Sequence, residues 1–259
     1  MNPFTYMFPD ELDAHLQDAQ SAAVLPIGSV EQHGPHLLLG CDAYIAHAIA
    51  AMTAEALPAV LMPLIPFSWI GGLRPFAGTV DLRPYLTMEY MEQVCLDILQ
   101  MGFSRLILVN SHGGGREAVF AVARNVHKKT GKRVLSTYPS QLYDNFPDIP
   151  AAWPKHGVTE PNDWSAYETS ELLGALSYFG KKNLAVQVAA NNSAALAEFG
   201  EIQVNIAPQS YRTASRLGEV GHDYTHECLH VQPRETVSQA GGIETMRLMA
   251  EKIAQAARV

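Results

Sequence analysis

The 259-residue chain is 47% hydrophobic and 17% charged, a composition typical of a globular protein with a sizeable core and not of a disordered or fibrous one. Its net charge of −8, with no run of five basic residues, argues against binding to nucleic acid or to an anionic membrane surface. We expect a cytoplasmic protein, because the N-terminus lacks a signal-peptide pattern and no apolar run is long enough to cross a bilayer. An odd number of widely spaced cysteines also favours a reducing compartment: Cys41, Cys95 and Cys228.

In the first half of the chain, short apolar runs alternate with helix-like segments. The predicted strands cover residues 21–28, 59–67, 105–110 and 133–139, and the predicted helices cover residues 42–57, 84–103 and 116–131. Asp42 stands at the N-cap position of the first of these helices. This alternation predicts βαβ crossovers and a mainly parallel α/β sheet that is covered on both faces.

The second half of the chain is less regular. Residues 140–165 are rich in Pro, Asp and Trp and are interpreted as a long functional loop or lid. Trp153 and Trp164 flank this segment and are candidate lid residues over a flat substrate, although packing against the core would explain them equally well. A helix over 165–180, a strand over 183–190 and a closing helix over 241–259 are also predicted. Without repeats or a low-complexity linker, residues 1–259 are expected to form a single domain.

The stretch "GSVEQHGPHLLLGCD" follows the first predicted strand and contains two carboxylates and two histidines, all of which can bind metal. In extended chain, Glu31 and His33 would point to the same side, about 6.5–7 Å apart. This separation suits two divalent ions about 3.5–4 Å apart, with Asp42 as the nearest carboxylate to bridge them. Taken singly, Asp42 could instead cap its helix, and His33 or His36 could be a turn residue that hydrogen-bonds the backbone.

A second cluster, "LILVNSHGGGRE", places His112 directly after a buried strand. Ligands of parallel sheets bind at the carboxyl ends of the strands, where His112 would lie. The glycines that follow would present backbone N–H groups at a helix N-terminus, which favours negative charge. A plain strand-to-helix turn would also explain the glycines, but it does not explain the histidine at their base.

The third cluster lies on the helix predicted for residues 165–180. Glu168 falls on its apolar stripe, whereas Glu171 lies off the centre of that stripe, toward solvent. A buried carboxylate needs a partner, either a metal ion or an arginine, and the metal is favoured. The stripe itself consists of Leu172, Ala175, Leu176 and Phe179.

Four segments, in this order and at this spacing, resemble the creatininase (creatinine amidohydrolase) family: "GSVEQHGPHLLLGCDAYIA", "FAGTVDLRP", "GFSRLILVNSHGGG" and "YETSELL". The resemblance spans roughly residues 22–180 and implies a three-layer α/β/α fold, a homohexamer and a site for two divalent metal ions. It also implies the ligand set, in which Asp42 bridges the two ions and His36 has no part. The other implied ligands are Glu31, His33, His112 and Glu168.

The chain departs from the family pattern where the chemistry would occur. Many members carry a histidine five residues before the glutamate of the "ETS" motif, where it resembles a general acid/base for the leaving nitrogen. Asp163 occupies that position here and is the candidate catalytic residue, although its side chain reaches less far. Gly113 and Gly114 stand where creatininase itself has bulky and acidic residues, so creatinine is a poor guess for the substrate.

The function predicted from these residues is hydrolysis of a C–N bond in a small cyclic or linear amide by a metal-activated water. The Gly113 to Gly115 loop would help to hold the developing oxyanion. Zinc is the metal that we expect first, and manganese or iron also suits the ligand set. The alternatives are hydrolytic ring opening of a cyclic ketone or lactone, and a non-catalytic metal-binding assembly protein. A dinuclear phosphoesterase would need more basic residues near these loops than Arg74, Arg83 and Arg116.

A further histidine cluster, "GHDYTHECLH", has i, i+4 spacing. On a helix its three imidazoles would share one face and could bind metal, but a surface or subunit contact is favoured because the main site is complete without them. The three residues are His222, His226 and His230.

Overall fold

The fold is described from a computed structural model that places residues 2–70, 76–160, 163–199 and 233–258. The predicted histidine cluster of His222, His226 and His230 lies outside these described residues, as does Arg74.

A parallel sheet forms the centre of the fold. Within the described residues it has five strands in the order β1-β3-β2-β4-β5, and each neighbouring pair is parallel. The strands are β1 (Asn2–Pro3), β2 (Ala22–Ile27), β3 (Val60–Leu61), β4 (Arg105–Asn110) and β5 (Arg133–Thr137). The predicted parallel sheet is therefore confirmed, although the predicted strand over 59–67 is only two residues long, because Pro63 lacks the N–H that a ladder needs.

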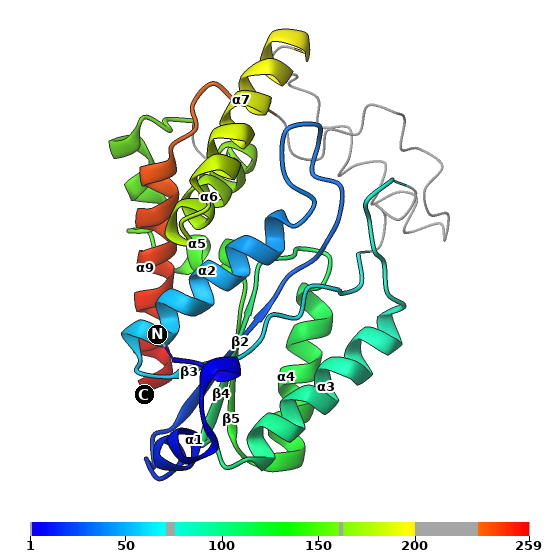
Figure 1. Cartoon of the computed structure of the whole chain (residues 1–259), viewed down its shortest axis with the longest axis vertical. Helices are drawn as coiled ribbons and strands as arrows, with labels where there is room; N and C mark the ends of the chain where they lie inside the picture. Colours follow the sequence, from blue (N-terminus) through cyan, green and yellow to red (C-terminus); the bar gives the residue numbers. More distant parts are fainter. Residues whose placement is uncertain (1, 71–75, 161–162, 200–232, 259) are drawn as a thin grey trace.

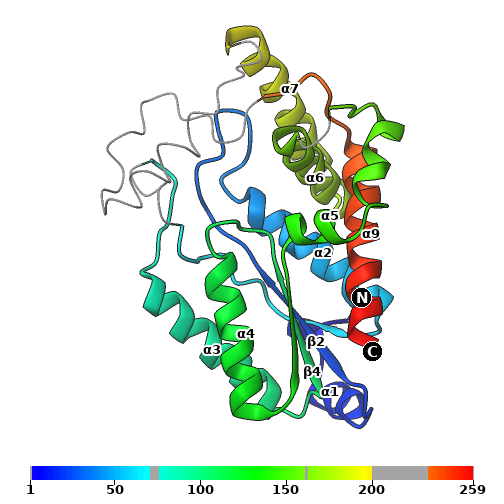
Figure 2. The same cartoon turned by 180° about the vertical axis from the view of Figure 1, so that it is seen from behind.

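Helices cover both faces of this sheet, which confirms the three-layer α/β/α fold. On one face lie α2 (Cys41–Ala56), α6 (Trp164–Tyr178) and α9 (Gln239–Arg258), and on the other lie α3 (Pro84–Gln100) and α4 (Arg116–Thr130), as Figures 1 and 2 show. The remaining helices are α1 (Pro9–Leu16), α5 (Pro139–Asn145) and α7 (Lys182–Phe199), with short 3-10 turns η1 (Phe4–Tyr6) and η2 (Pro150–His156). None of the placed helices combines the length and apolar character needed to span a bilayer.

Strand β2 contributes to two separate cores because its side chains alternate between the two faces of the sheet. Val24 packs into the core formed by α2, α6 and α9, whereas Leu25 packs into the core formed with α3 and α4. A strand that is buried on both faces consists of continuous apolar residues, which explains why this run was recognisable in the sequence.

The strand predicted over residues 183–190 is wrong, because this segment forms part of helix α7. A short apolar run cannot by itself be distinguished from a buried helical stretch. The buried positions of α7 show the helical repeat: Ala185, Val188, Asn192 and Ala195 are spaced by three or four residues.

The prediction of one long loop over residues 140–165 is also wrong, because α5 and η2 make up half of this segment. Trp153 lies within η2, is fully buried and stacks on Tyr167 with ring centroids 4.7 Å apart. Its indole N–H donates to the Tyr143 hydroxyl at 3.2 Å. This enclosed position fits the core-packing interpretation of Trp153, while Trp164 remains 44% exposed at the start of α6.

Candidate metal centre

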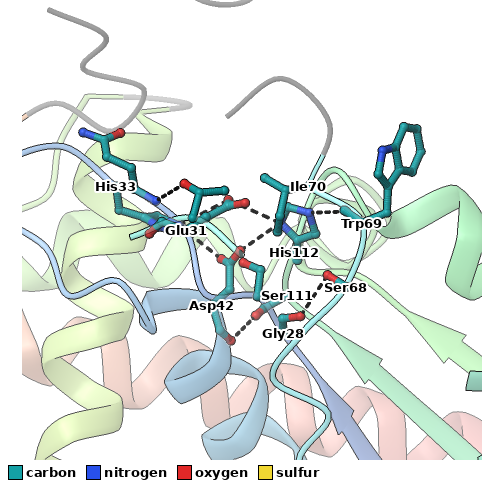
Figure 3. Close-up of polar contacts among 12 residues, drawn as sticks. Gly28, Glu31, His33, Asp42, Ser68, Trp69, Ile70, Ser111 and His112 are labelled. Atoms are coloured by element: carbon teal, nitrogen blue, oxygen red, sulfur yellow. Dashed lines mark hydrogen bonds and ion pairs between the residues drawn. The ribbon is translucent and has the colours of Figure 1, made fainter. Parts of the chain in front are cut away.

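The first two sequence clusters meet at the carboxyl edge of the sheet. The loop after β2 carries Glu31 and His33, Asp42 lies in the first turn of α2, and His112 follows β4. All four residues are at most 4% exposed, and in Figure 3 their side chains point toward one another. The strand ends therefore bring together residues that are up to 81 positions apart (31 to 112) in the sequence.

Asp42 lies between the two histidines. Its Oδ1 is 3.5 Å from Nε2 of His33, and its Oδ2 is 3.0 Å from Nδ1 of His112. Glu31 Oε1 is 3.3 Å from the same His112 nitrogen and 3.8 Å from the same His33 nitrogen. Each oxygen of the Asp42 carboxylate thus faces a different imidazole, which is the arrangement expected of a bridging carboxylate.

Glu168 on α6 joins this cluster from the third sequence motif. Its Oε1 is 3.1 Å from His33 Nε2, and its side chain is 26% exposed. A metal ion as the partner of Glu168 stays a prediction, and the group that Glu168 faces in the structure is the imidazole of His33. Two groups have ligand atoms close enough to hold an ion among the described residues: Glu31, His33 and Asp42, and His33, Cys41 and Glu168.

Backbone carbonyls orient both imidazoles. The Nδ1 of His33 is 3.0 Å from the carbonyl oxygen of Glu31, and the Nε2 of His112 is 3.0 Å from that of Trp69. A ring nitrogen that donates to a carbonyl leaves the other nitrogen with its lone pair free for a metal. In both residues that second nitrogen faces the carboxylates, so it is the nitrogen that would bind a metal after losing its proton.

The predicted N-cap role of Asp42 is wrong. Helix α2 begins at Cys41 with Gly40 as its N-cap, which places Asp42 inside the first turn. The carboxylate accepts a hydrogen bond from the Ser29 hydroxyl at 2.6 Å and faces the imidazoles. Because the helix starts one residue earlier, the side chain of Asp42 projects into the cluster and does not fold back over the helix end.

The cluster attracts positive charge strongly. Burial alone lowers the pKa of His33, but the carboxylates of Asp42 and Glu168 outweigh burial and raise it well above its usual value. Burial also lowers the pKa of His112, while Glu31 and Asp42 raise it to about 10. Burial raises the pKa of Asp42, but the two histidines more than offset this and depress it. A divalent cation would satisfy the same demand for positive charge.

A buried oxygen of Glu31 supports this interpretation. Glu31 is 2% exposed, and its Oε2 has no hydrogen-bond partner among the residues that the structure describes. A buried carboxylate oxygen without a partner is costly unless a cation binds it. Together with two imidazoles that each turn one nitrogen toward the carboxylates, this oxygen fits a divalent metal of the zinc, manganese or ferrous iron class.

The prediction that Glu171 faces solvent is wrong. Glu171 is only 5% exposed, and its Oε1 accepts a hydrogen bond from the Tyr143 hydroxyl at 2.7 Å. Burial raises the pKa of Glu171 to about 8, the Tyr143 hydrogen bond opposes the shift, and the nearby Glu168 and Asp42 add to it. The apolar stripe gave the wrong exposure for Glu171 because α6 contacts other helices on several sides. The face of α6 that was expected to meet solvent is therefore covered as well.

The loop after His112 is packed closely beneath the cluster. Gly113 and Gly114 are exposed, and a Cβ atom on Gly114 would lie 2.6 Å from His112 Nε2 and 2.9 Å from the carbonyl oxygen of Ile70. A side chain at residue 114 would therefore displace the imidazole. Asn110 braces the same turn from β4, because its side chain bonds both the N–H and the carbonyl of His112.

Asp163 is held by two contacts. As N-cap of α6, its Oδ1 accepts from the N–H of Ala166 at 3.1 Å, and its Oδ2 forms an ion pair with Arg234 Nε at 2.8 Å. Arg234 is itself positioned by Asn192, whose side-chain amide bonds the backbone N–H and carbonyl of Arg234. The residue predicted as the acid/base thus has both carboxylate oxygens engaged.

Several residues of the site were missed in the sequence. Cys41 directly precedes Asp42, and Ser29 lies two residues before Glu31, so their nearness in the sequence could have been noticed. Trp69 contributes a carbonyl, and a backbone group leaves no signal in residue type.

His36 is 1% exposed and both of its ring nitrogens lack a hydrogen-bond partner within the described part of the chain. Burial, His33 and Arg234 together lower the pKa of His36 to about 4, so it is neutral.

Comparisons with known proteins identify the family of the chain. Residues 6–198 match the family model described as Creatininase: Creatinine amidohydrolase. The chain is 27% identical to the creatinine amidohydrolase of Pseudomonas putida over 39% of this chain and 41% of that protein. It is 35% identical to the mycofactocin precursor peptide peptidase of Mycolicibacterium smegmatis over 38% and 42%, respectively. It is 29% identical to the 3-dehydro-scyllo-inosose hydrolase of Thermotoga maritima over 40% and 33%. The matched segment thus spans less than half of each of these relatives.

Solved structures of creatininases have the same fold. A creatinine amidohydrolase structure superposes with a TM-score of 0.72 at 18% identity, covering 98% of this chain and 95% of that one. A Zn-Zn form of a creatininase variant gives 0.72 at 18% identity over 99% and 96%, and a manganese form gives 0.66 at 17% over 99% and 97%. Because the family model matches most of the sequence and the metal-binding motifs converge in the fold, the chain belongs to the creatininase family.

Proposed function

We propose that this protein is an amidohydrolase that uses two divalent metal ions to hydrolyse a C–N bond in a small cyclic or linear amide. The observation that carries the proposal is the position of Asp42, whose two carboxylate oxygens face two different buried imidazoles. Glu31 and His112 would complete the ligands on one side of Asp42, and His33 and Glu168 those on the other. When bound, the metal pair would supply Lewis-acid activation of a water and of the substrate carbonyl.

The protein's own groups would prepare this site before substrate arrives. The carbonyls of Glu31 and Trp69 hold the imidazoles of His33 and His112 in orientation, and Ser29 fixes the Asp42 carboxylate. Such preorganisation avoids reorganisation when charge develops in the reaction. Gly113 and Gly114 are exposed at the start of α4, where backbone N–H groups would meet the carbonyl oxygen of a substrate.

Protonation of the leaving nitrogen remains the prediction made for Asp163. Its ion pair with Arg234 and its bond to the N–H of Ala166 favour a positioning role for the carboxylate, with a water as the immediate proton donor. An Asp163→Asn variant would then keep its metal and fold, and its kcat for amides would fall more than its kcat for an activated ester whose leaving group needs no proton.

Metal analysis of Asp42→Asn tests the proposal directly. The wild-type protein should bind two equivalents of divalent metal, and the variant should lose both together with its activity, because the neutral amide cannot bridge two cations. Elemental analysis after gel filtration measures the stoichiometry, and circular dichroism checks the fold. Thr53→Val, a buried change farther along α2, is the matched control and should retain both metals. Full metal content in Asp42→Asn would contradict the proposal.

A second candidate function is the hydrolytic ring opening of a cyclic ketone or lactone. It is favoured by the engaged Asp163, since such a substrate releases no nitrogen, and by the likeness to a hydrolase that acts on an inosose. The likeness to a peptidase favours linear amides instead. A hydrolysis screen of cyclic amides, peptides and formamides against cyclic ketones and lactones separates the two, because turnover of ketones or lactones alone would exclude the amidohydrolase.

Zinc as the resident metal, a homohexameric assembly and a cytoplasmic location belong to the same proposal. Zinc and manganese forms are known for the structural relatives, and the assembly rests on the family resemblance. Elemental analysis of protein purified without added metal tests the first, light scattering of the eluted protein tests the second, and fractionation of the source cells tests the third.

A further inference from the structure

Cys41 is a side chain of the cluster that the family resemblance did not assign. It is the first residue of α2, immediately precedes Asp42 and is 0% exposed. Its sulfur lies in one group with ligand atoms of His33 and Glu168, all within 4.8 Å of one another. The thiol is thus adjacent to the His33 side of the Asp42 carboxylate, not the His112 side.

The spacing of these three atoms suits a single cation. Bonds from zinc are about 2.3 Å to sulfur, about 2.0–2.1 Å to nitrogen and about 2.0–2.2 Å to oxygen. Two ligands of one ion are therefore separated by at most the sum of two bonds, about 4.0–4.5 Å. The three ligand atoms lie within 4.8 Å of one another, so side-chain adjustment alone would bring them to such separations. Cys41 and Glu168 also belong to two helices that pack against each other.

Cys95 shows what a cysteine with a purely packing role looks like in the same protein. It lies on α3, is equally buried, and packs in the apolar core with Met91 and Leu99. None of the candidate metal groups among the described residues contains Cys95. Cys41 also contacts apolar neighbours of its own core, but in addition it faces an imidazole and a carboxylate.

An independent observation indicates that this cluster binds a cation. The Oε2 atom of Glu31 is buried and has no hydrogen-bond partner among the described residues. Glu31 shares His33 with the group that contains Cys41, because His33 belongs to both candidate groups. The thiol therefore lies beside a cluster that is already short of a cation.

We propose that Cys41 is a direct ligand of the metal on the His33 and Glu168 side, so that the two metal positions differ in chemistry. This inference rests on the proposed binuclear function. One position would have a soft thiolate, and the other, next to His112, only nitrogen and oxygen ligands. When the sulfur–metal bond forms, the thiol proton is released to solvent, with no change in oxidation state. A thiolate selects zinc or cobalt over manganese, so this position discriminates between metals.

Cobalt binding to a protein with a single thiol tests the inference. In the full-length Cys95→Ser/Cys228→Ser variant, Cys41 is the sole remaining cysteine. Titration with Co²⁺ should give a near-ultraviolet thiolate-to-cobalt charge-transfer band that saturates with one of two bound ions. Adding Cys41→Ser should abolish the band and weaken zinc binding at that position at least about tenfold, the lower end of the loss caused by removing even an outer-shell partner.

Zinc X-ray absorption of the wild-type protein provides a second measurement that needs no variant. It should show a zinc–sulfur distance of about 2.3 Å, with one such bond for every two zinc ions, because only one of the two ions binds the thiolate. If two ions bind without sulfur in their ligand shell and without the cobalt band, the inference about Cys41 is overturned while the binuclear proposal stands. If neither cobalt nor zinc binds at all, both fail.

Discussion

The hydroxyl of Ser29 is the direct support of the Asp42 carboxylate. It donates to Oδ2 at 2.6 Å from the loop that follows β2, and both residues are buried. Partners that orient a metal-binding carboxylate contribute to affinity without touching the ion. Ser29→Ala should therefore weaken metal binding by about 10–100-fold while leaving the number of sites unchanged.

Competition with a chromophoric chelator measures that affinity. Ser68→Ala is the matched control, since Ser68 is equally buried nearby but donates to the carbonyl of Gly28 and not to a carboxylate. Equal affinities of Ser29→Ala and Ser68→Ala would show that the hydroxyl of Ser29 does not support the centre.

The protonation of Glu171 makes the stability of the folded protein depend on pH. Burial raises its pKa to about 8 from the ordinary value of 4.5, so the folded protein holds this proton more tightly than the unfolded chain. Its contribution to stability is complete below about pH 4.5 and is lost as the pH rises through about 8. Glu171→Gln keeps an oxygen that can accept from Tyr143 and removes the titration.

The comparison uses protein from which a chelator has removed the metal. Between about pH 5 and pH 9, we expect the free energy of unfolding to fall less for Glu171→Gln than for the wild type. Urea unfolding at each pH gives the free energy of unfolding. Glu251→Gln on the exposed face of α9 is the control and should follow the wild type. A wild-type curve parallel to that of Glu171→Gln would refute the burial argument.

At the scale of elements, the crossing of α6 and α9 depends on a missing side chain. A Cβ atom on Gly242 would lie 1.9 Å from the carbonyl oxygen of Ser170, a backbone atom that cannot turn aside. In an exposed helix, replacing Gly by Ala stabilises by about 1 kcal/mol. Here the sign should reverse, and Gly242→Ala should destabilise the protein by about 1–3 kcal/mol because α9 must move away from α6.

Thermal and urea unfolding measure this change, and metal content reports whether the displacement of α6 reaches Glu168. Glu251→Ala, a change to alanine on the exposed face of the same helix, is the control. An unchanged or increased stability of Gly242→Ala would show that the two helices are not in close contact at this point.

Elements with strong local signals could be predicted from the sequence, and elements defined by their surroundings could not. The apolar run of β4 predicted a buried parallel strand, and the residues that follow it placed His112 at the carboxyl end of that strand. By contrast, the helical state of α7 and the burial of Glu171 depend on which surfaces the neighbouring helices cover. The hydrophobic pattern of one segment does not contain that information. The same limit explains why Arg234, distant in sequence, was not expected beside Asp163.

At the scale of the whole molecule, the candidate centre joins segments that are far apart in the sequence. The loop after β2, the start of α2, the loop after β4 and helix α6 each provide at least one of its side chains. Three carboxylates converge there, and their repulsion opposes folding unless cations offset it. Metal binding should therefore stabilise the folded protein as a whole.

The size of this effect follows from mass action. With free metal at 100 times the dissociation constant, each site adds about 2.7 kcal/mol to the free energy of unfolding. For a chain of this length, that corresponds to a rise of about 5–11 °C in Tm. Chelation should lower Tm of the wild type by at least this amount, and readdition of zinc should restore it. Asp42→Asn should have a Tm that does not respond to chelator, because it binds no metal. A wild-type Tm that is likewise insensitive to chelator would mean that the converging side chains, whatever their charge, are held together by the fold alone.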